Sequence, residues 1–344
     1  MKKNSYNEIK KKHVLFYSSV KTKELFNIQR FYKTDIQILE NLGYGVILSN
    51  RIIDACKFWR YDFVFAYFYR YSLFVAIIAK LFGKNTYFTG GIDNLDRNLV
   101  SAREYIIQKY LFGFCYYFSK SCIIVSKTDR ENVRRILNGR KLSYSEHTID
   151  TKQFDCELSY KQKFCTTIVW QATVANVERK GVDTTLRLFA MLHQFPQYKD
   201  YKLFIIGKKG EGTLYLQKLV SELEIEDAVV FTDSITEEEK IDYLKKSRLY
   251  FQLSKFEGFG VAAIEALCAK NIVIHSGRGG LSNPIYNDGI FVNIDQTIEQ
   301  MYNVLKKDLE TFEEAKLEAA HQNVCKYYDN ERRKEDFSRI IIEG

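Results

Sequence analysis

The sequence predicts an α/β protein with two doubly wound parallel sheets in tandem. Short apolar strands alternate with helical segments along most of the 344 residues, an order typical of parallel sheets. The alternation restarts after a polar stretch at residues 151–164, and the length suits two hydrophobic cores better than one. We therefore expect one domain over residues 1–155 and a second over residues 160–327, facing each other across a cleft where ligands meet the carboxyl ends of the strands.

The first domain is expected to alternate five strands with long helices. The strands are predicted at residues 13–18, 44–49, 61–68, 85–89 and 121–126. The helices are predicted at residues 31–42, 72–82 and 101–119. Gly43 and Gly83 follow the first two helices, where a residue often takes the left-handed conformation.

The second domain repeats this pattern. The strands are predicted at residues 166–171, 203–206, 229–232, 250–253 and 271–275. Helices are expected after Gly181, over residues 214–223 and 237–247, and after Gly260. The tail from Glu299 is helical in pattern, and its last part, residues 328–344, is expected to cross back onto the first domain.

Composition indicates a globular protein of the cytoplasm. Hydrophobic residues make up 46% of the chain, and there are only two prolines. The seven cysteines are odd in number and scattered, and no two stand at the spacing of metal ligands, so we expect reduced thiols. The apolar run after the basic N-terminus covers only residues 14–17, which fits a strand rather than a signal peptide. Charges interrupt the aromatic-rich residues 58–82, so no transmembrane helix is predicted.

Positive charge is concentrated in the first domain. Residues 1–155 hold 26 Lys and Arg against 14 Asp and Glu, a net charge of +12, whereas the remainder has a net charge of −4. Much of the excess lies in residues 120–141. This charge fits peripheral contact with an anionic membrane, a lipid-diphosphate acceptor or a solvated surface. No nucleic-acid-binding motif accompanies it, so nucleic acid is not expected as a partner.

Residues 253–267 are the most informative segment for function. An apolar strand leads to Glu257, then Gly258 and Gly260 precede an alanine-rich helical pattern that carries Glu265. Such a turn directs backbone N–H groups and the positive end of a helix to one place, which suits a phosphate. A glutamate would repel the phosphate beside it unless it binds something else, and sugar hydroxyls are the obvious candidates. The segment therefore predicts a site for a sugar joined to a diphosphate.

Residues 165–290 resemble the second domain of the family 4 retaining glycosyltransferases, which have the two-domain GT-B fold. The resemblance rests on five motifs in the same order: Lys180-Gly181, Phe231-Thr232-Asp233, Ser254-Lys255-Phe256-Glu257-Gly258-Phe259-Gly260, Glu265-Ala266-Leu267 and Gly279-Gly280. The first 150 residues agree with that family in layout but carry little motif.

The resemblance implies a role for each matching residue. Glu257 would contact the hydroxyls of the donor sugar, and Lys180 would bind the diphosphate. The phosphate would also meet the backbone N–H groups of Gly258, Phe259 and Gly260. Glu265 would hold the ribose, and residues 231–235, including Ser234 and Ile235, would hold the base through their backbone. The sugar would be transferred with its configuration kept, the leaving phosphate accepting the proton. No Asp-x-Asp motif is present, so neither a metal nor another cofactor is expected.

The sequence departs from the family pattern in both domains. Ala175 stands where the family has an arginine, and Arg179 is the substitute nearest in sequence. Arg179 and Lys180 would face opposite ways on an extended chain, however. Where many members have a histidine in the first domain, this chain has Gly90-Gly91-Ile92-Asp93-Asn94. Gly91, Asp93 and Asn94 are therefore candidates for contact with the acceptor or the sugar, although Asp93 equally suits a turn or a helix cap.

These features predict a hexosyltransferase that uses a nucleotide diphosphate sugar in surface polysaccharide biosynthesis, such as lipopolysaccharide or capsule. The acceptor would be a glycan or a saccharide linked to a lipid diphosphate, reached from the cytoplasm at the inner face of the membrane. A phosphorylase or epimerase on the same scaffold would need a phosphate site or other carboxylates that the sequence does not show. A catalytically inactive sugar-nucleotide-binding or scaffold protein stays open as the alternative because the arginine is missing.

Overall fold

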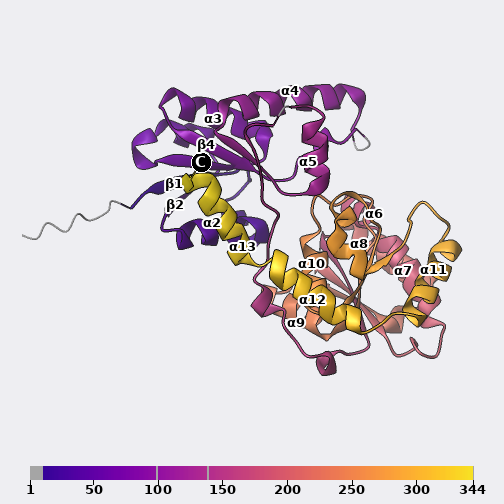
Figure 1. Cartoon of the computed structure of the whole chain (residues 1–344). Coiled ribbons are helices and arrows are strands. Elements are labelled where there is room, and N and C mark those ends of the chain that lie inside the picture. The colour runs from indigo at the N-terminus through magenta and orange to yellow at the C-terminus, as the bar shows by residue number, and fades with distance from the viewer. Residues whose placement is uncertain (1–10, 98–99, 138, 344) are drawn as a thin grey trace, which may run out of the picture. The chain divides into compact units, whose positions relative to one another are not determined.

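The computed structural model describes residues 11–97, 100–137 and 139–343 (Figure 1). The chain divides into two compact units, the first made of Met1–Thr148 with Asn330–Gly344 and the second of Ile149–Asp329. Each unit has a six-stranded sheet in which every strand pairs in parallel with its neighbours. The predicted class, two doubly wound α/β sheets, is confirmed.

The first unit has strand order β2-β1-β3-β4-β5-β6. Its strands are β1 (His13–Tyr17), β2 (Gly45–Ser49), β3 (Phe63–Tyr67), β4 (Asn85–Thr89), β5 (Ser121–Ile124) and β6 (Leu142–Tyr144). Its helices are α1 (Leu25–Ile28), α2 (Arg30–Asn41), α3 (Tyr69–Leu81), α4 (Ala102–Phe118), α5 (Lys127–Arg134) and α13 (Asn330–Phe337). All five residues of β3 are buried, as expected for a parallel strand covered on both faces.

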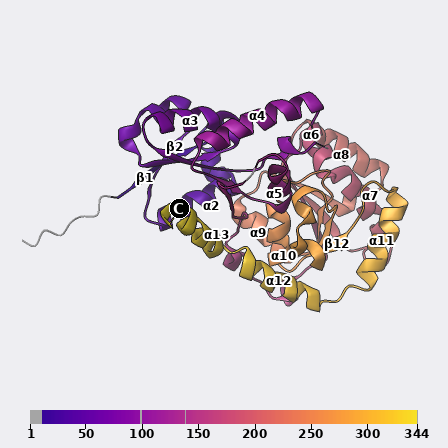
Figure 2. The ribbon, with the colours of Figure 1, turned by 45° about the horizontal axis from the view of Figure 1, so that its top comes forward.

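The C-terminal helix α13 is part of the first unit and lies beside α2 (Figures 1 and 2). Arg333 is fully buried, and its Nε and Nη2 donate to the two carboxylate oxygens of Asp35 at 2.6 and 2.8 Å. A planar guanidinium matches a carboxylate in this bidentate geometry. Phe337 packs on Phe65 of β3, with ring centroids 5.1 Å apart. Helix α13 is thus tied to α2 by an ion pair and to the first sheet by an aromatic contact.

The second unit has strand order β12-β11-β10-β7-β8-β9. Its strands are β7 (Phe164–Gln171), β8 (Lys202–Lys208), β9 (Val229–Asp233), β10 (Ser247–Gln252), β11 (Ile272–His275) and β12 (Ile290–Phe291). Its helices are α6 (Val174–Lys180), α7 (Val182–His193), α8 (Glu211–Glu222), α9 (Glu237–Lys246), α10 (Val261–Cys268), α11 (Ile298–Glu310) and α12 (Ala315–Tyr327). The order of the strands reverses between β7 and β10, and ligands bind at the carboxyl ends of the strands at such a switch point.

The main departure from the predicted elements is helix α6, which occupies a segment expected to be extended. The hydroxyl of Thr173 caps it by accepting from the backbone N–H of Asn176 at 3.2 Å. Only Val177 of its seven residues is buried, so the sequence has no apolar period there. Strands β6 and β12 and helix α5 were also absent from the prediction. No helix within the described ranges is both long and apolar enough to cross a membrane.

Candidate donor site at the carboxyl end of strand β10

The turn after β10 is held in shape by a second glycine loop. Gly260 has φ +86°, and a Cβ there would lie 2.7 Å from the hydroxyl of Tyr286. That hydroxyl donates to the carbonyl of Gly260 at 3.0 Å. The N–H of Gly280 donates to the carbonyl of Glu257 at 2.6 Å, where a Cβ on Gly279 would collide with the same carbonyl. Gly260 and Gly279 both have positive φ and no room for a Cβ, so glycine is needed at each of these two positions.

The carboxylate of Glu257 is fixed through one oxygen. Its side chain is 10% exposed, and Oε1 accepts from Gln252 Nε2 and Ser254 Oγ, each at 2.9 Å. Lys180 Nζ donates to the same oxygen. Among the described residues, no hydrogen bond is made to Oε2 of Glu257, so this oxygen is available to a ligand hydroxyl. Gln252 and Ser254 are neutral hydrogen-bond donors, so the buried carboxylate keeps two hydrogen bonds even when Lys180 moves away.

The donors to Glu257 belong to a polar chain along one face of β10 and the residues after it. Tyr250, Gln252 and Ser254 alternate along the strand and are all buried, and the hydroxyl of Tyr250 donates to Gln252 Oε1 at 2.6 Å. The pKa of Tyr250 is raised well above its usual value, first by burial and then by the carboxylates of Glu257 and Glu265. Tyr250 therefore remains a neutral donor at physiological pH. The sequence motif did not reveal this supporting chain.

Lys180 and Arg179 both approach Glu257 from the end of α6. Gly181 has φ +63° and packs against the carbonyl of Leu253, while the N–H of Lys255 donates to the carbonyl of Arg179 at 2.8 Å. These contacts join the end of α6 to the turn after β10. Arg179 Nη1 lies 3.9 Å from Glu257 Oε1. The expectation that the two basic residues face opposite ways is wrong, because they lie on a helix, where neighbours diverge by about 100°.

Glu265 lies within α10 and is almost completely buried. Lys240 Nζ donates to its Oε2 at 2.8 Å and is also 2.8 Å from Glu237 Oε1. Lys240 therefore orients the carboxylate that was predicted to hold the ribose. This lysine belongs to α9 and was another residue that the sequence reasoning missed.

The segment predicted to hold the base follows β9. Asp233 has φ +63°, and its Oδ1 accepts from the backbone N–H groups of Lys209 and Ser234 at 3.0 and 2.8 Å. These two bonds hold the pKa of Asp233 below its usual value. Ser234 is exposed and Ile235 is half-buried. Asp233 thus links the ends of β8 and β9 beside the predicted base-binding backbone.

The candidates in the first unit follow β4. Gly91 lies just beyond the strand, and Asp93 and Asn94 begin a 3-10 helix, Asp93–Leu95. Asn94 is half-buried. The preceding Gly90 has φ +110°, and a Cβ there would lie 3.0 Å from the ring of Phe68. These residues stand at the carboxyl edge of the first sheet, where parallel folds place ligands.

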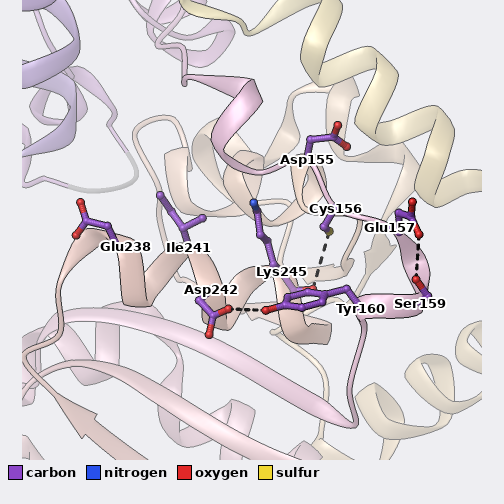
Figure 3. Close-up of a pocket in the computed structure, with 9 residues that line it drawn as sticks. All are labelled: Asp155, Cys156, Glu157, Ser159, Tyr160, Glu238, Ile241, Asp242 and Lys245. Carbon is purple, nitrogen blue, oxygen red and sulfur yellow. Dashed lines mark hydrogen bonds between the residues drawn. The ribbon is translucent and has the colours of Figure 1, made fainter.

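A separate hollow of about 500 Å³ lies in the second unit between residues 155–160 and α9 (Figure 3). The hydroxyl of Tyr160 donates to Asp242 Oδ1 at 2.9 Å across it. None of the residues predicted to bind the donor lines this hollow. We therefore place the candidate donor site at the turn after β10 and not here.

Residues 172–316 match the model of a family described as glycosyl transferases group 1. The O-antigen chain mannosyltransferase RfbU of Salmonella typhimurium is 24% identical over 87% of this chain and 86% of that protein. These findings support a glycosyltransferase. A GDP-mannose:cellobiosyl-diphosphopolyprenol alpha-mannosyltransferase of Xanthomonas oryzae is 33% identical, over 28% of this chain and 25% of that protein.

Solved structures agree on the GT-B fold. Sucrose-phosphate synthase from Thermosynechococcus elongatus aligns with a TM-score of 0.75 at 13% identity, covering 97% of this chain and 99% of that chain. HepE from Anabaena, in complex with UDP and glucose, aligns with a TM-score of 0.74 at 14% identity, covering 97% of this chain and 100% of that chain. The family match lies within the second unit and includes every donor-binding candidate.

Proposed function

We propose that this protein is a retaining, metal-independent family 4 glycosyltransferase of surface polysaccharide biosynthesis. It would move a hexosyl-type sugar from a nucleotide diphosphate sugar to a glycan or lipid-linked saccharide acceptor. The observation that carries the proposal is the contact between Lys180 and Glu257 beside the glycine turn that begins α10. The relatives named for O-antigen and diphosphopolyprenol substrates support this class of acceptor.

Donor binding would separate the two partners of this ion pair. Lys180 would turn to the diphosphate, whose charge exceeds that of one carboxylate, and Glu257 would accept hydrogen bonds from the sugar. Gln252 and Ser254 would still donate to Glu257 Oε1, so the buried carboxylate would not be left without partners. The backbone N–H groups at Gly258, Phe259 and Gly260 would meet the phosphate at the positive end of α10.

The chemical step would be supported mainly by electrostatics. The bond between the sugar and the phosphate oxygen breaks as positive charge develops on the sugar ring, and the acceptor hydroxyl bonds to the same face. Its proton passes to an oxygen of the departing phosphate. Lys180, Arg179 and the start of α10 would stabilise the leaving diphosphate, which is the task that a metal performs in other enzymes. Glu257 would fix the orientation of the sugar.

The position of Arg179 weakens the alternative of an inactive sugar-nucleotide-binding or scaffold protein. That alternative rests on Ala175, which replaces an arginine of the family pattern. Arg179 Nη1 lies 3.9 Å from Glu257 Oε1, so a second cation stands beside the pair although it comes from another position. We propose that Arg179 takes over the contact with the diphosphate.

Turnover of the donor tests this function without knowledge of the acceptor. Slow release of nucleoside diphosphate from a panel of nucleotide sugars should be measurable, and Glu257→Ala or Lys180→Ala should abolish it. Lys255→Ala is the matched control, because Lys255 belongs to the same motif but its side chain is 59% exposed and pairs with Glu178. Tight binding of a donor without turnover over any acceptor would favour the scaffold protein instead.

A surface on the first unit supports contact with an anionic membrane, where a lipid-linked acceptor would be met. Helix α4 presents an outer stripe of four large side chains, 54–64% exposed: Ile106, Tyr110, Phe114 and Tyr117. Their spacing places them on one face, and Lys80 Nζ lies 5.2 Å from the ring of Tyr117. Exposed aromatic residues beside lysines are typical of helices at a membrane interface.

A basic hollow continues this surface. It measures about 650 Å³ and is lined by Lys120, Arg140, Lys141 and Arg339 among others. Lys141 Nζ donates to the carbonyl of Tyr117 at 3.0 Å, which joins the hollow to the outer stripe of α4. We propose that the stripe inserts among lipid chains while the basic residues meet anionic head groups.

Sedimentation with vesicles tests this surface. The protein should bind vesicles of phosphatidylglycerol and phosphatidylcholine more tightly than vesicles of phosphatidylcholine alone. The double variant Tyr110→Ser, Phe114→Ser should bind at least about tenfold more weakly, because each ring removes apolar area from water. Tyr327→Ser changes a 51% exposed tyrosine of the second unit and is the control. Equal binding by both variants, or no binding by the wild type, would contradict the proposal.

A further inference from the structure

Two cysteines and a histidine converge at the far end of α10 from the candidate donor site. Cys268 is the last residue of α10, and His321 and Cys325 stand one turn apart on α12, which packs against α10. One ligand atom from each of the three side chains lies within 4.8 Å of the other two. Cysteine sulfur and histidine nitrogen are the ligands that zinc prefers in proteins.

The ring of His321 is oriented as a metal ligand would be. Nδ1 lies 2.6 Å from the backbone carbonyl of Cys268. A carbonyl only accepts, so Nδ1 donates to it, and in the neutral ring Nε2 then presents a lone pair. Nε2 lies 3.5 Å from Cys325 Sγ and 3.7 Å from Asp155 Oδ1. Histidines that bind metals usually donate their other ring N–H to such a carbonyl.

The spacing of one ligand pair matches tetrahedral coordination. With zinc–sulfur and zinc–nitrogen bonds of about 2.3 and 2.1 Å, a tetrahedron separates the two ligand atoms by about 3.6 Å. Cys325 Sγ and His321 Nε2 are 3.5 Å apart. We propose that Cys268, His321 and Cys325 bind a zinc ion, with the carboxylate of Asp155 as the fourth ligand. The proposal does not depend on the function of the donor site.

The charges around the cluster fit this ion. Two thiolates and the Asp155 carboxylate would exceed the charge of zinc by one, and Lys270 Nζ lies 4.0 Å from Asp155 Oδ1. Glu318 also pairs with Lys270, at 2.9 Å.

The ion would serve the structure of the second unit. It would join residue 155, the end of α10 and the middle of α12, three segments that are distant in sequence. Cys268 lies eight residues from Gly260, or about 12 Å along the helix axis, so the ion would not touch the diphosphate. Its effect on the donor site would come through the position of α10.

Metal analysis of protein without a histidine tag tests the site. Purified under reducing conditions with zinc supplied, the chain should hold about one zinc, and cobalt substitution should give the sulfur-to-cobalt charge-transfer band of a tetrahedral site. Cys325→Ser should lose both signals. Asp155→Asn should shift the cobalt spectrum but keep the charge-transfer band, which guards against loss of signal through misfolding. Cys56→Ser, a half-buried thiol in the first unit, is the control and should keep the metal.

Three results would overturn the proposal. The wild type could remain free of zinc and cobalt after reconstitution in reductant. Cys325→Ser could bind as much cobalt as Cys56→Ser. A loss of two hydrogens in mass, reversed by reductant and absent from Cys325→Ser, would instead identify a disulfide between Cys268 and Cys325.

Discussion

The carboxyl edges of the two sheets differ in what fills them. In the second unit, Glu257 is held by Gln252, Ser254 and Lys180, so buried polar groups converge on one carboxylate. In the first unit, Gly90 turns the chain against the ring of Phe68, and the turn is packed by an aromatic side chain. A diphosphate needs a fixed arrangement of charge and N–H groups, whereas acceptors vary in shape. Under the proposed function, the edge that binds the donor would be specified by a sequence motif, and the edge that meets the acceptor by the shape of its surface.

The largest effect is expected when a positive charge is removed from the carboxyl edge of the second sheet. Lys180→Ala should lower kcat about 10²–10³-fold, because it removes a cation whose side chain is only 14% exposed from the leaving diphosphate. Arg179, whose side chain is 46% exposed, should matter less, and Arg179→Ala should cost about tenfold or less. Steady-state kinetics with a responsive donor measures both. An unchanged kcat in Lys180→Ala would contradict the claim that the polar groups at the edge of the second sheet serve the leaving diphosphate.

Acidification should weaken the second unit through His275. Burial lowers its pKa from 6.5 to about 4. Between these pH values the unfolded chain binds a proton that the native state refuses, so stability falls as the pH decreases, by about 3 kcal/mol in total. Urea titrations at pH 7 and pH 4.5 should show a smaller loss in His275→Gln than in the wild type. The first unit also has a buried histidine, His147, whose pKa is lowered by burial and Arg333, so part of the loss should persist.

The smallest effect compares two glycines, one from each unit. Gly260→Ala should lower the free energy of unfolding by about 2 kcal/mol, because φ is +86° and the new Cβ meets Tyr286. Gly113 of α4 has no atom within 4 Å of its Cβ position, so Gly113→Ala should stabilise the protein by about 0.5–1 kcal/mol. Denaturant unfolding measures both changes. A destabilised Gly113→Ala together with an unaffected Gly260→Ala would reverse the comparison.

The elements predicted best from the sequence are those whose ends are marked by neighbouring residues such as glycine. Strand β4 has the predicted bounds, Asn85–Thr89, because Gly83 and Gly90 flank a continuous β-rich run. Helix α6 was missed because only Val177 is buried, which leaves no repeating pattern of apolar residues in its sequence. Strand β12 was missed because its two residues are too few to show the alternation of a strand.

The candidate site shows the same division between local and distant information. The motif around Glu257 is local, and its residues could be proposed from the sequence. The contact between Lys180 and Glu257 joins residues 77 apart, and the support from Lys240 and Tyr286 depends on packing between separate elements. Cys268 and His321 are 53 residues apart, so their approach is visible only in the folded chain. The roles of the site residues stay predictions.

Equilibrium binding of two ligands to two variants tests the central claim most directly. A nucleoside diphosphate and the matching nucleotide sugar should be titrated calorimetrically into the wild type, Glu257→Ala and Lys180→Ala. If Glu257 holds the sugar and Lys180 the diphosphate, Glu257→Ala should bind the nucleoside diphosphate at least as tightly as the wild type, because Lys180 no longer leaves an ion pair. The same variant should lose the added affinity for the sugar. Lys180→Ala should bind both ligands more weakly. Equal weakening of both ligands by Glu257→Ala, or no change with either variant, would contradict the account.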